Sequence, residues 1–256
     1  MRKDFRAAAA AIIGSVLLLA PGAGAQAAEI KVLAVGPLSG AFKDLVPQFE
    51  RAGGHKVVVQ YQATPNLLKQ IEAGEAFDLA ILVGSALNDP AMQAFFAGPR
   101  TPVSSVGLGV AVRAGAPKPD LRSAESFKQA LLNAKSVAIM PEAVNGKHFL
   151  SVFERLGIGN EMKAKIKPQK APDDVAQAVA KGEAELALFV SNLLVSVPGV
   201  DFGGPVPTEF QQILVFTAAV SAKAKEPEAA NALVKHLTSP VSAAAMKAHG
   251  MDVPQP

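Results

Sequence analysis

Short apolar runs alternate with amphipathic segments along the first third of the chain. Between the runs, apolar residues return at helical spacing, which predicts helices with one buried face. The runs themselves are rich in β-branched residues and predict buried strands. The strands are Ile30–Val35, Lys56–Tyr61 and Phe77–Val83, and the helices contain Phe42, Leu45, Val46 and Phe49, or Leu67, Leu68 and Ile71. Since strand–helix–strand units of this length imply parallel strands, the chain begins as an α/β fold.

The same alternation returns after about residue 135. Ser136–Met140 and Glu185–Val190 are further predicted strands, and each is followed by polar residues and a helical pattern. Two other strands, Val103–Arg113 and Gln212–Val220, are interpreted as crossings between two parts of the chain. The glycine- and proline-rich stretch Val197–Pro207 is predicted to be a surface loop.

The predicted architecture is therefore two α/β lobes joined by two hinge crossings. Residues 28–105 and 221–256 are assigned to the first lobe, and residues 106–220 to the second. In such folds ligands bind where the carboxyl ends of strands meet the following loops, so we expect a cleft between the lobes. The last residues, 252–256, are expected to be frayed.

Polar residues cluster where predicted strands end and the following helices begin. Helix N-termini present unpaired N–H groups and a partial positive charge, and nearby hydroxyl and amide groups add neutral donors. Together they suit a small anion. In the first lobe Thr64 is interpreted as a helix N-cap with Pro65 at the first helical position, and Asp173 or Asp174 as a cap in the second. The candidate ligand residues are Ser39, Thr64, Asn66, Asn145, Gly146, Lys147, His148, Ser191 and Asn192.

The N-terminus has the pattern of a secretory signal. Residues 1–6 are basic, residues 7–20 form a short apolar core, and Ala25-Gln26-Ala27 fits the small-x-small cleavage rule. We expect cleavage after Ala27 and a periplasmic product. Loss of this segment lowers the net charge from +3 to about +1, which gives no indication of a nucleic-acid partner.

Composition excludes several kinds of chemistry. The chain has no cysteine, so disulfides, thiolate catalysis and cysteine metal sites are ruled out. Its four histidines have no partner at metal-site spacing, and no nucleophile elbow, P-loop or dinucleotide fingerprint is present. We therefore expect no metal, no cofactor and no catalysis.

Five segments resemble the periplasmic molybdate-binding proteins of ABC importers, a type II solute-binding family. They are IKVLAVGPLSGAFKDLVPQFE, LLKQIEAGEAFDLAILVG, IMPEAVNGKHFLSVFERLGI, APDDVAQAVAKGEAELALFVSN and HLTSPVSAAAMKAHG. The resemblance extends over nearly all of residues 29–250. It implies a monomer with two hinged lobes, which binds a small anion and delivers it to a permease in the inner membrane.

The family's ligand residues are only partly present. The serine that donates to the oxyanion in the family falls at Pro37, and a second serine falls at Thr64 or Pro65. A tyrosine of the family falls at Val190, whereas Val175 matches a position that contributes a backbone N–H. Because proline has no N–H group, Pro37 also removes a backbone donor.

These departures leave the ligand open. Molybdate or tungstate is the family expectation, and an organic carboxylate is the rival, because Lys147 and His148 would suit charge-assisted bonds. Replacement of Lys147 by alanine is then expected to weaken binding with little loss of stability. An enzyme that uses the same cleft, or a sensor that signals to a receptor, remain alternatives of a different class.

Overall fold

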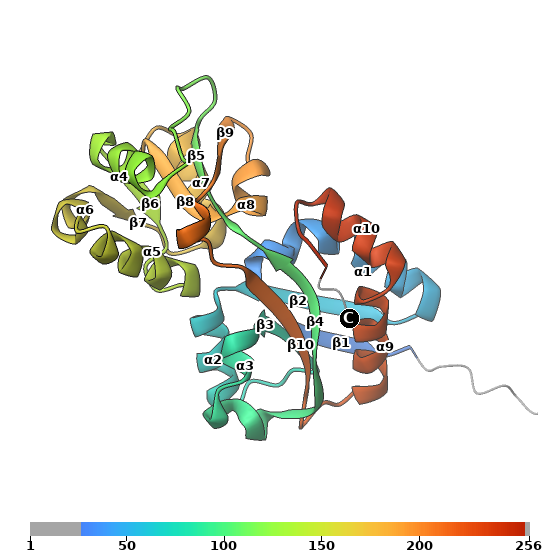
Figure 1. Cartoon of the computed structure of the whole chain (residues 1–256). Helices are drawn as coiled ribbons and strands as arrows, with labels where there is room; N and C mark the ends of the chain where they lie inside the picture. The colour runs from blue at the N-terminus through green and yellow to red at the C-terminus, as the bar shows by residue number, and fades with distance from the viewer. Residues whose placement is uncertain (1–26, 254–256) are drawn as a thin grey trace, which may run out of the picture.

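Two five-stranded sheets organise the molecule into two lobes (Figure 1). The computed structural model describes residues 27–253, so the predicted signal peptide, apart from its last residue, lies outside the described part. Each sheet has helices on its faces, which confirms the expected fold class of two α/β lobes.

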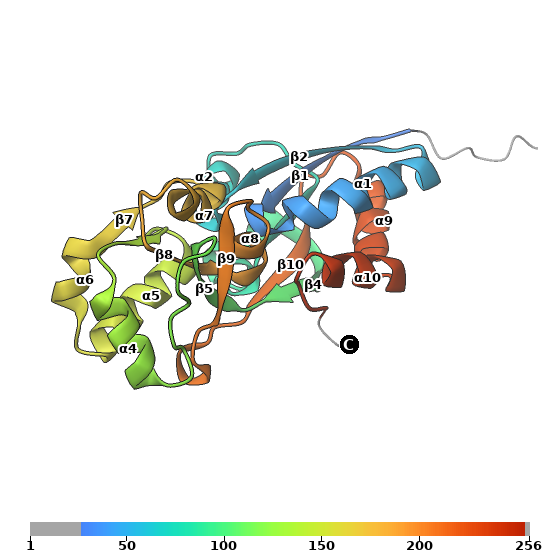
Figure 2. The same ribbon diagram turned by 90° about the horizontal axis from the view of Figure 1, so that it is seen from above.

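The first lobe is built on a sheet with the strand order β2-β1-β3-β10-β4. The central strand β1 is parallel to β2 and β3, and β10 is antiparallel to both β3 and β4. Figure 2 shows α9 and α10 beside α1 at the end of this lobe. The elements are β1 (Glu29–Val35), η1 (Gly36–Leu38), α1 (Ser39–Gly53), β2 (Lys56–Gln62), α2 (Thr64–Glu72), β3 (Leu79–Val83), α3 (Gly84–Leu87), η2 (Pro90–Phe95), β4 (Phe96–Val106), β10 (Leu214–Ser221), α9 (Pro227–Leu237) and α10 (Pro240–Ala248).

The second lobe repeats this arrangement with the strand order β7-β6-β8-β5-β9. Here β6 is parallel to β7 and β8, and β5 is antiparallel to both β8 and β9. The elements are β5 (Leu108–Arg113), α4 (Ala124–Asn133), β6 (Val137–Ile139), α5 (Val144–Arg155), α6 (Gly159–Lys165), β7 (Ile166–Pro168), α7 (Pro172–Ala180), β8 (Leu186–Val190), α8 (Ser191–Val195), β9 (Val200–Pro205) and η3 (Thr208–Phe210).

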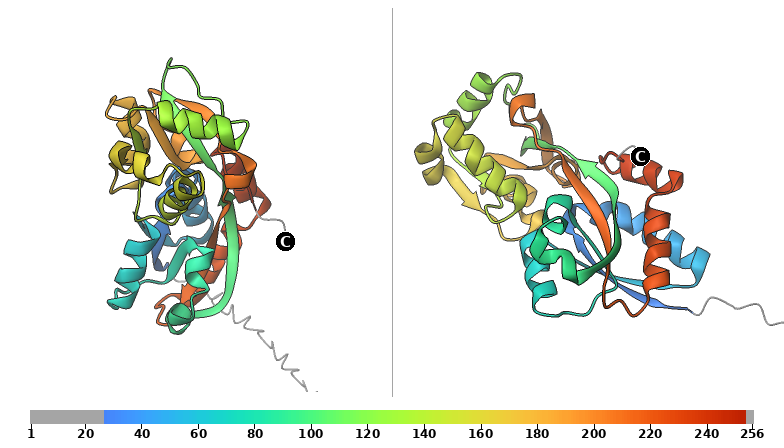
Figure 3. Two further views of the ribbon diagram at one scale, coloured as in Figure 1. Left: turned by 60° about the vertical axis from the view of Figure 1, so that its left-hand side comes forward. Right: turned by 60° about the horizontal axis from the view of Figure 1, so that its bottom comes forward.

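The chain passes between the lobes at two neighbouring points. β4 leads into β5 through Gly107, and the segment before β10 leads back, as both views of Figure 3 show. The side chain of Gln211 joins the two connections, because its amide accepts the N–H of Leu108 at 2.6 Å and donates to the Leu108 carbonyl at 3.0 Å. β10 pairs over its whole length within the first sheet. Residues 214–220, which the sequence placed in the second lobe, therefore belong structurally to the first.

Four local expectations were wrong. Residues 200–205 form the edge strand β9 rather than a loop, because their backbone pairs with β5. Thr64 and the aspartates at 173 and 174 lie inside the first turns of α2 and α7, whose N-caps are Ala63 and Ala171. Asp252 is not frayed, since it forms a bridge with Ser105 next to the crossing.

A buried carboxylate explains one residue of the second family-like segment. Asp78 is 4% exposed and follows the turn before β3. Its two oxygens accept the N–H groups of Lys31 (2.9 Å), Lys225 (2.7 Å) and Glu226 (3.1 Å). It therefore ties β1 to the start of α9, whose N-cap residue supplies no side-chain bond of its own. This aspartate holds the first lobe together and is remote from the cleft.

Candidate functional site

A small cavity lies between the lobes, where the carboxyl ends of their parallel strands face each other. Its volume is about 30 Å³. The first lobe contributes residues from the ends of β1, β2 and β3 and from β10, and the second lobe contributes residues from the ends of β6 and β8 and from the starts of α5 and α7. The lining residues are Val35, Gly36, Pro37, Gln62, Ala63, Thr64, Val83, Met140, Ala143, Val144, Asn145, Pro172, Phe189, Val190, Leu214 and Phe216. We refer to this space as the interlobe cavity.

The helices that begin at the interlobe cavity have N-termini without side-chain caps. This holds for η1, α2, α5 and α7, whose first residues line the cavity from both lobes. Helices α6 and α9, which start away from the cavity, also lack a side-chain cap, so the absence of a cap does not by itself distinguish the cavity. Prolines at the starts of η1, α2 and α7 remove some of the N–H groups. The N–H groups that remain, together with the partial positive charge of the N-termini, favour an anion.

Asn145 provides the clearest sign that a ligand is expected in this cavity. It is 3% exposed, occupies the second position of α5, and its Nδ2 atom has no hydrogen-bond partner among the described residues. A buried amide donor without a partner costs about 1–3 kcal/mol. Thr64, which is 5% exposed at the start of α2, lines the cavity from the first lobe. The cavity thus has side-chain donors on both lobes, Gln62 and Thr64 on the first and Asn145 on the second.

Two glycines allow the backbone to approach closely at this site. A Cβ atom on Gly146 would lie 1.8 Å from the carbonyl oxygen of Met140, so only glycine lets α5 start against the end of β6. A Cβ atom on Gly36 would lie 2.8 Å from Cγ of Pro172 in the opposite lobe. The lobes therefore touch beside the cavity, and a larger residue at either position would displace a wall of it.

Two other expected ligand residues line a neighbouring groove. Ser39 and Asn192 contribute to a surface pocket bounded by α1, α7, α8 and α10. Asn192 is 5% exposed, and its Nδ2 atom donates to the Pro37 carbonyl at 2.8 Å. This bond crosses between the lobes, so Asn192 has a bridging position rather than one in the cavity wall.

The structure does not bring Lys147 or His148 to the cavity. Lys147 is exposed on α5, and His148 donates through Nε2 to the carbonyl oxygen of Phe210 at 2.7 Å. Asn66 is likewise exposed, on α2. All three follow the cavity-lining residues of their helices by one or more positions, and the helical rotation turns them away from the cleft.

Two further candidate ligand residues, Val175 and Ser191, occupy positions outside the cavity wall. Val175 is fully buried in α7 and is not among the cavity-lining residues. The Ser191 hydroxyl donates to the Gly107 carbonyl at 3.1 Å, and its backbone N–H donates to the same oxygen at 2.9 Å. Ser191 therefore ties the start of α8 to the crossing between the lobes.

Most cavity-lining residues were not among the expected site residues, because they are apolar. Phe189, Leu214 and Phe216 have the strand pattern of core residues, and only their position near the lobe crossing distinguishes them. The resemblance did indicate Pro37 and Val190, since both stand where the family has hydroxyl groups. In the sequence, the site was therefore indicated by the positions where strands end, and not by any side-chain motif.

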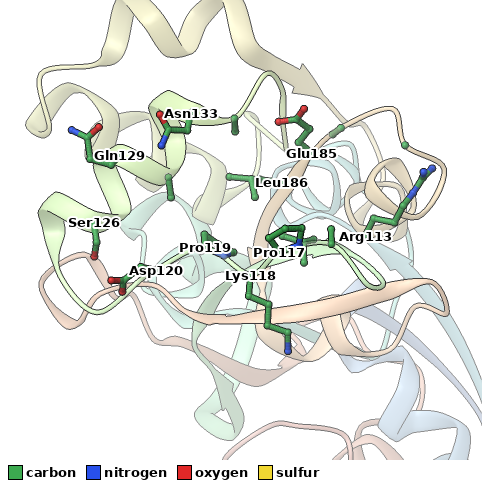
Figure 4. Close-up of a pocket in the computed structure, with 16 residues that line it drawn as sticks. Arg113, Pro117, Lys118, Pro119, Asp120, Ser126, Gln129, Asn133, Glu185 and Leu186 are labelled. Carbon is green, nitrogen blue, oxygen red and sulfur yellow. The ribbon is translucent and has the colours of Figure 1, made fainter.

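A much larger hollow of about 830 Å³ lies on the second lobe alone, between α4, the loop after β5 and the turn before β8 (Figure 4). Figure 4 shows Arg113 and Lys118 directed away from Pro117 and Pro119 at its centre. Arg122 lowers the pKa of the neighbouring Asp120 through paired hydrogen bonds. Because no residue of the first lobe lines this hollow, it does not use the facing strand ends that define the interlobe cavity.

Over residues 30–252 the chain matches the family model of the bacterial extracellular solute-binding proteins. The chain belongs to this family. It is 32% identical over 231 residues to a Pseudomonas aconitate isomerase, with 87% of each chain covered. It is also 30% identical over 246 residues to the molybdate-binding protein ModA of Azotobacter vinelandii, which covers 92% of this chain and 96% of ModA.

The fold of this solute-binding protein matches solved relatives. The periplasmic molybdate-binding protein of Azotobacter vinelandii superposes with a TM-score of 0.74 at 21% identity, over 88% of this chain and all of the relative. The expected resemblance to molybdate-binding proteins and the two-lobe fold are thereby confirmed. In the described residues, no helix is long and apolar enough to cross a membrane, and no group of three or more His, Cys, Asp or Glu side chains is placed to hold a metal.

Proposed function

We propose that this solute-binding protein captures a small anion in the interlobe cavity and delivers it to the permease of an ABC importer. The single observation that supports this most is the unpartnered Nδ2 atom of Asn145, buried in a cavity around which uncapped helix N-termini converge. A ligand that accepts hydrogen bonds and bears negative charge would satisfy both features at once.

The cavity is suited to holding an anion without a counter-charge. Among its described lining residues none is charged, and the polar side chains are Gln62, Thr64 and Asn145. Neutral donors and helix dipoles can stabilise one small anion while they leave no cation unpaired when the site is empty. A protein that must bind and release its ligand repeatedly benefits from this arrangement.

The remaining parts of the proposal follow from the family and from the sequence. The protein would be exported by its N-terminal signal, act in the periplasm as a monomer, and close its lobes about the ligand. No cofactor is required. The relatives of the family with molybdate in their names support an oxyanion such as molybdate or tungstate as one ligand, and an organic carboxylate is the alternative.

Titration calorimetry on protein freed of ligand by unfolding and refolding tests this proposal. The panel contains molybdate, tungstate, sulfate, phosphate and several carboxylates, with neutral amides as controls. At least one anion is expected to bind with heat that is absent for its uncharged analogue. If no anion of any class binds, the cavity is not an anion site and the proposal fails.

A second candidate function is isomerisation of aconitate, which the name of the 32%-identical relative suggests. Proton transfer at carbon needs a basic side chain within reach of the substrate. None of the described residues that line the interlobe cavity is titratable, which favours binding without catalysis. Incubation with each isomer of aconitate, followed by NMR, decides between the two. Conversion that disappears in the Asn145→Leu variant would establish the enzyme instead.

A further inference from the structure

We propose that the ligand of the interlobe cavity is a small monocarboxylate with a short apolar chain. This inference rests on the proposed anion-binding function and specifies the ligand class. The structural reason is that the lining combines few polar side chains with a majority of apolar ones. The polar side chains are Gln62, Thr64 and Asn145, and the apolar side chains come from both lobes.

The apolar part of the lining is buried. Its side chains are at most 7% exposed, and they come from strands of both sheets and from Met140, which directly follows β6. They are Val35, Val83, Met140, Phe189, Val190, Leu214 and Phe216. A second carboxylate, or the far oxygens of a tetrahedral dianion, would be placed against these groups without a partner. Such burial of unpaired charge is strongly unfavourable.

The polar part of the lining matches one carboxylate. Thr64 and Asn145 line the cavity from opposite lobes, Gln62 adds an amide on the first lobe, and the Nδ2 atom of Asn145 has no partner among the described residues. A carboxylate has two oxygens, each of which can accept from one lobe. A four-oxygen anion needs additional donors, and Pro37 occupies the wall with a ring that has neither hydroxyl nor N–H.

The small size of the cavity favours the short members of this ligand class. One water-sized group requires about 10–15 Å³ of such a cavity, so about 30 Å³ admits two or three groups in the present arrangement of the lobes. The contacts of Gly36 with Pro172 and of Asn192 with Pro37 hold the lobes together at this separation. Acetate has four non-hydrogen atoms and butyrate has six, so the lobes must open to admit any member of the class, and they must open least for the shortest chains.

A chain-length series measured by calorimetry tests the inference directly. Acetate, propionate, butyrate and longer straight-chain carboxylates are titrated beside molybdate, sulfate, aconitate and propionamide. Affinity is expected to rise about fourfold for each added methylene, as buried CH₂ groups predict, and then to fall when the chain exceeds the cavity. Propionamide, which has no charge, is expected not to bind.

Two matched variants show whether the apolar wall sets this preference. Leu214→Ala enlarges the cavity from β10, and the optimum is expected to move to a chain that is one or two carbons longer. Leu233→Ala removes an equally buried side chain from α9, outside the cavity, and should lower stability without moving the optimum.

The outcomes separate this inference from the broader function. If molybdate, sulfate or a tricarboxylate binds more tightly than every monocarboxylate, the inference is wrong and the anion-binding function stands. If affinity does not depend on chain length, or if Leu214→Ala leaves the optimum in place, the apolar wall does not contact the ligand and the inference is again wrong. If no anion binds, the proposed function itself fails.

Discussion

Replacement of Asn145 by leucine should raise the stability of the empty protein and lower its affinity for ligand. In the empty protein the Nδ2 atom of Asn145 is buried without a partner, at a cost of about 1–3 kcal/mol. Leucine has a similar size and no polar atoms, so the substitution removes this cost. For a chain of this length each kcal/mol corresponds to about 2–4 °C in Tm. The melting temperature of the ligand-free variant is therefore expected to rise by several degrees.

The same substitution removes a donor that would bond to the bound anion. Hydrogen bonds to charged groups contribute about 1.5–3 kcal/mol, so Kd should increase by about ten- to hundredfold. Melting curves measured with and without ligand, together with calorimetry, give both quantities on one preparation. Asn66→Leu is the control, because Asn66 begins the same kind of helix but is exposed, and it should change neither value.

The opposite signs of the two effects make the prediction easy to refute. A purely structural amide would lower the melting temperature when it is replaced and would leave affinity unchanged. If Asn145→Leu gives this result, the unpartnered Nδ2 atom does not bind a ligand, and the proposal that the interlobe cavity is the binding site is wrong.

Four further substitutions test other parts of the reasoning. Thr64→Val should weaken anion binding about tenfold by calorimetry at unchanged stability, because it removes one donor of the first lobe and keeps the shape; unchanged affinity would remove Thr64 from the site. Lys147→Ala should change affinity less than twofold in the same assay, since Lys147 is exposed outside the cavity. The sequence alone led us to expect weaker binding, and a larger loss of affinity would support that expectation. Gly146→Ala should lower the free energy of unfolding, measured with denaturant, by about 3 kcal/mol, because the added methyl group meets the Met140 carbonyl. Wild-type stability of this variant would show that α5 can shift freely. Partial burial of Tyr61, which is 36% exposed, raises its pKa from its ordinary value of 10.0 to about 12. The unfolded chain therefore ionises first, and stability should fall modestly as pH rises above 10; Tyr61→Phe should reduce this loss, and phenolate absorbance of this single tyrosine should titrate above its ordinary range.

The scaffold could be predicted from sequence because its signals are local and repeated. Period-3.6 patterns identified the helices α1 and α2, and continuous apolar patterns identified the strands β1 and β3. The edge strand β9 was missed because glycine and proline dominate it, and its strand character comes from pairing with β5. Such pairing is a long-range contact that no local pattern encodes.

The binding residues were harder to predict, because helix orientation decides which of several neighbouring polar residues faces the cleft. Asn145, Gly146, Lys147 and His148 are consecutive, but only Asn145 lines the cavity. The expectation that Lys147 and His148 would assist binding considered their charge and ignored the rotation of α5. Asp78 gives the converse case: it stands in the second family-like segment, and it accepts three backbone hydrogen bonds that join parts of the first lobe.

The side chains of the site can change while the backbone of the fold stays the same, and this explains how one fold can bind different anions. The partial charge of a helix N-terminus comes from the backbone, so it persists when the surrounding side chains change. Under the proposed function, the preference for an anion would therefore be set by the topology of the two sheets. Pro37 and Val190 stand where the resemblance places hydroxyl groups, and both line the cavity with apolar surface. Substitutions at such positions alter which anion fits without altering the charge that the site prefers, and on this reasoning the ligand of this protein should differ from that of its molybdate-binding relatives while binding at the same strand ends.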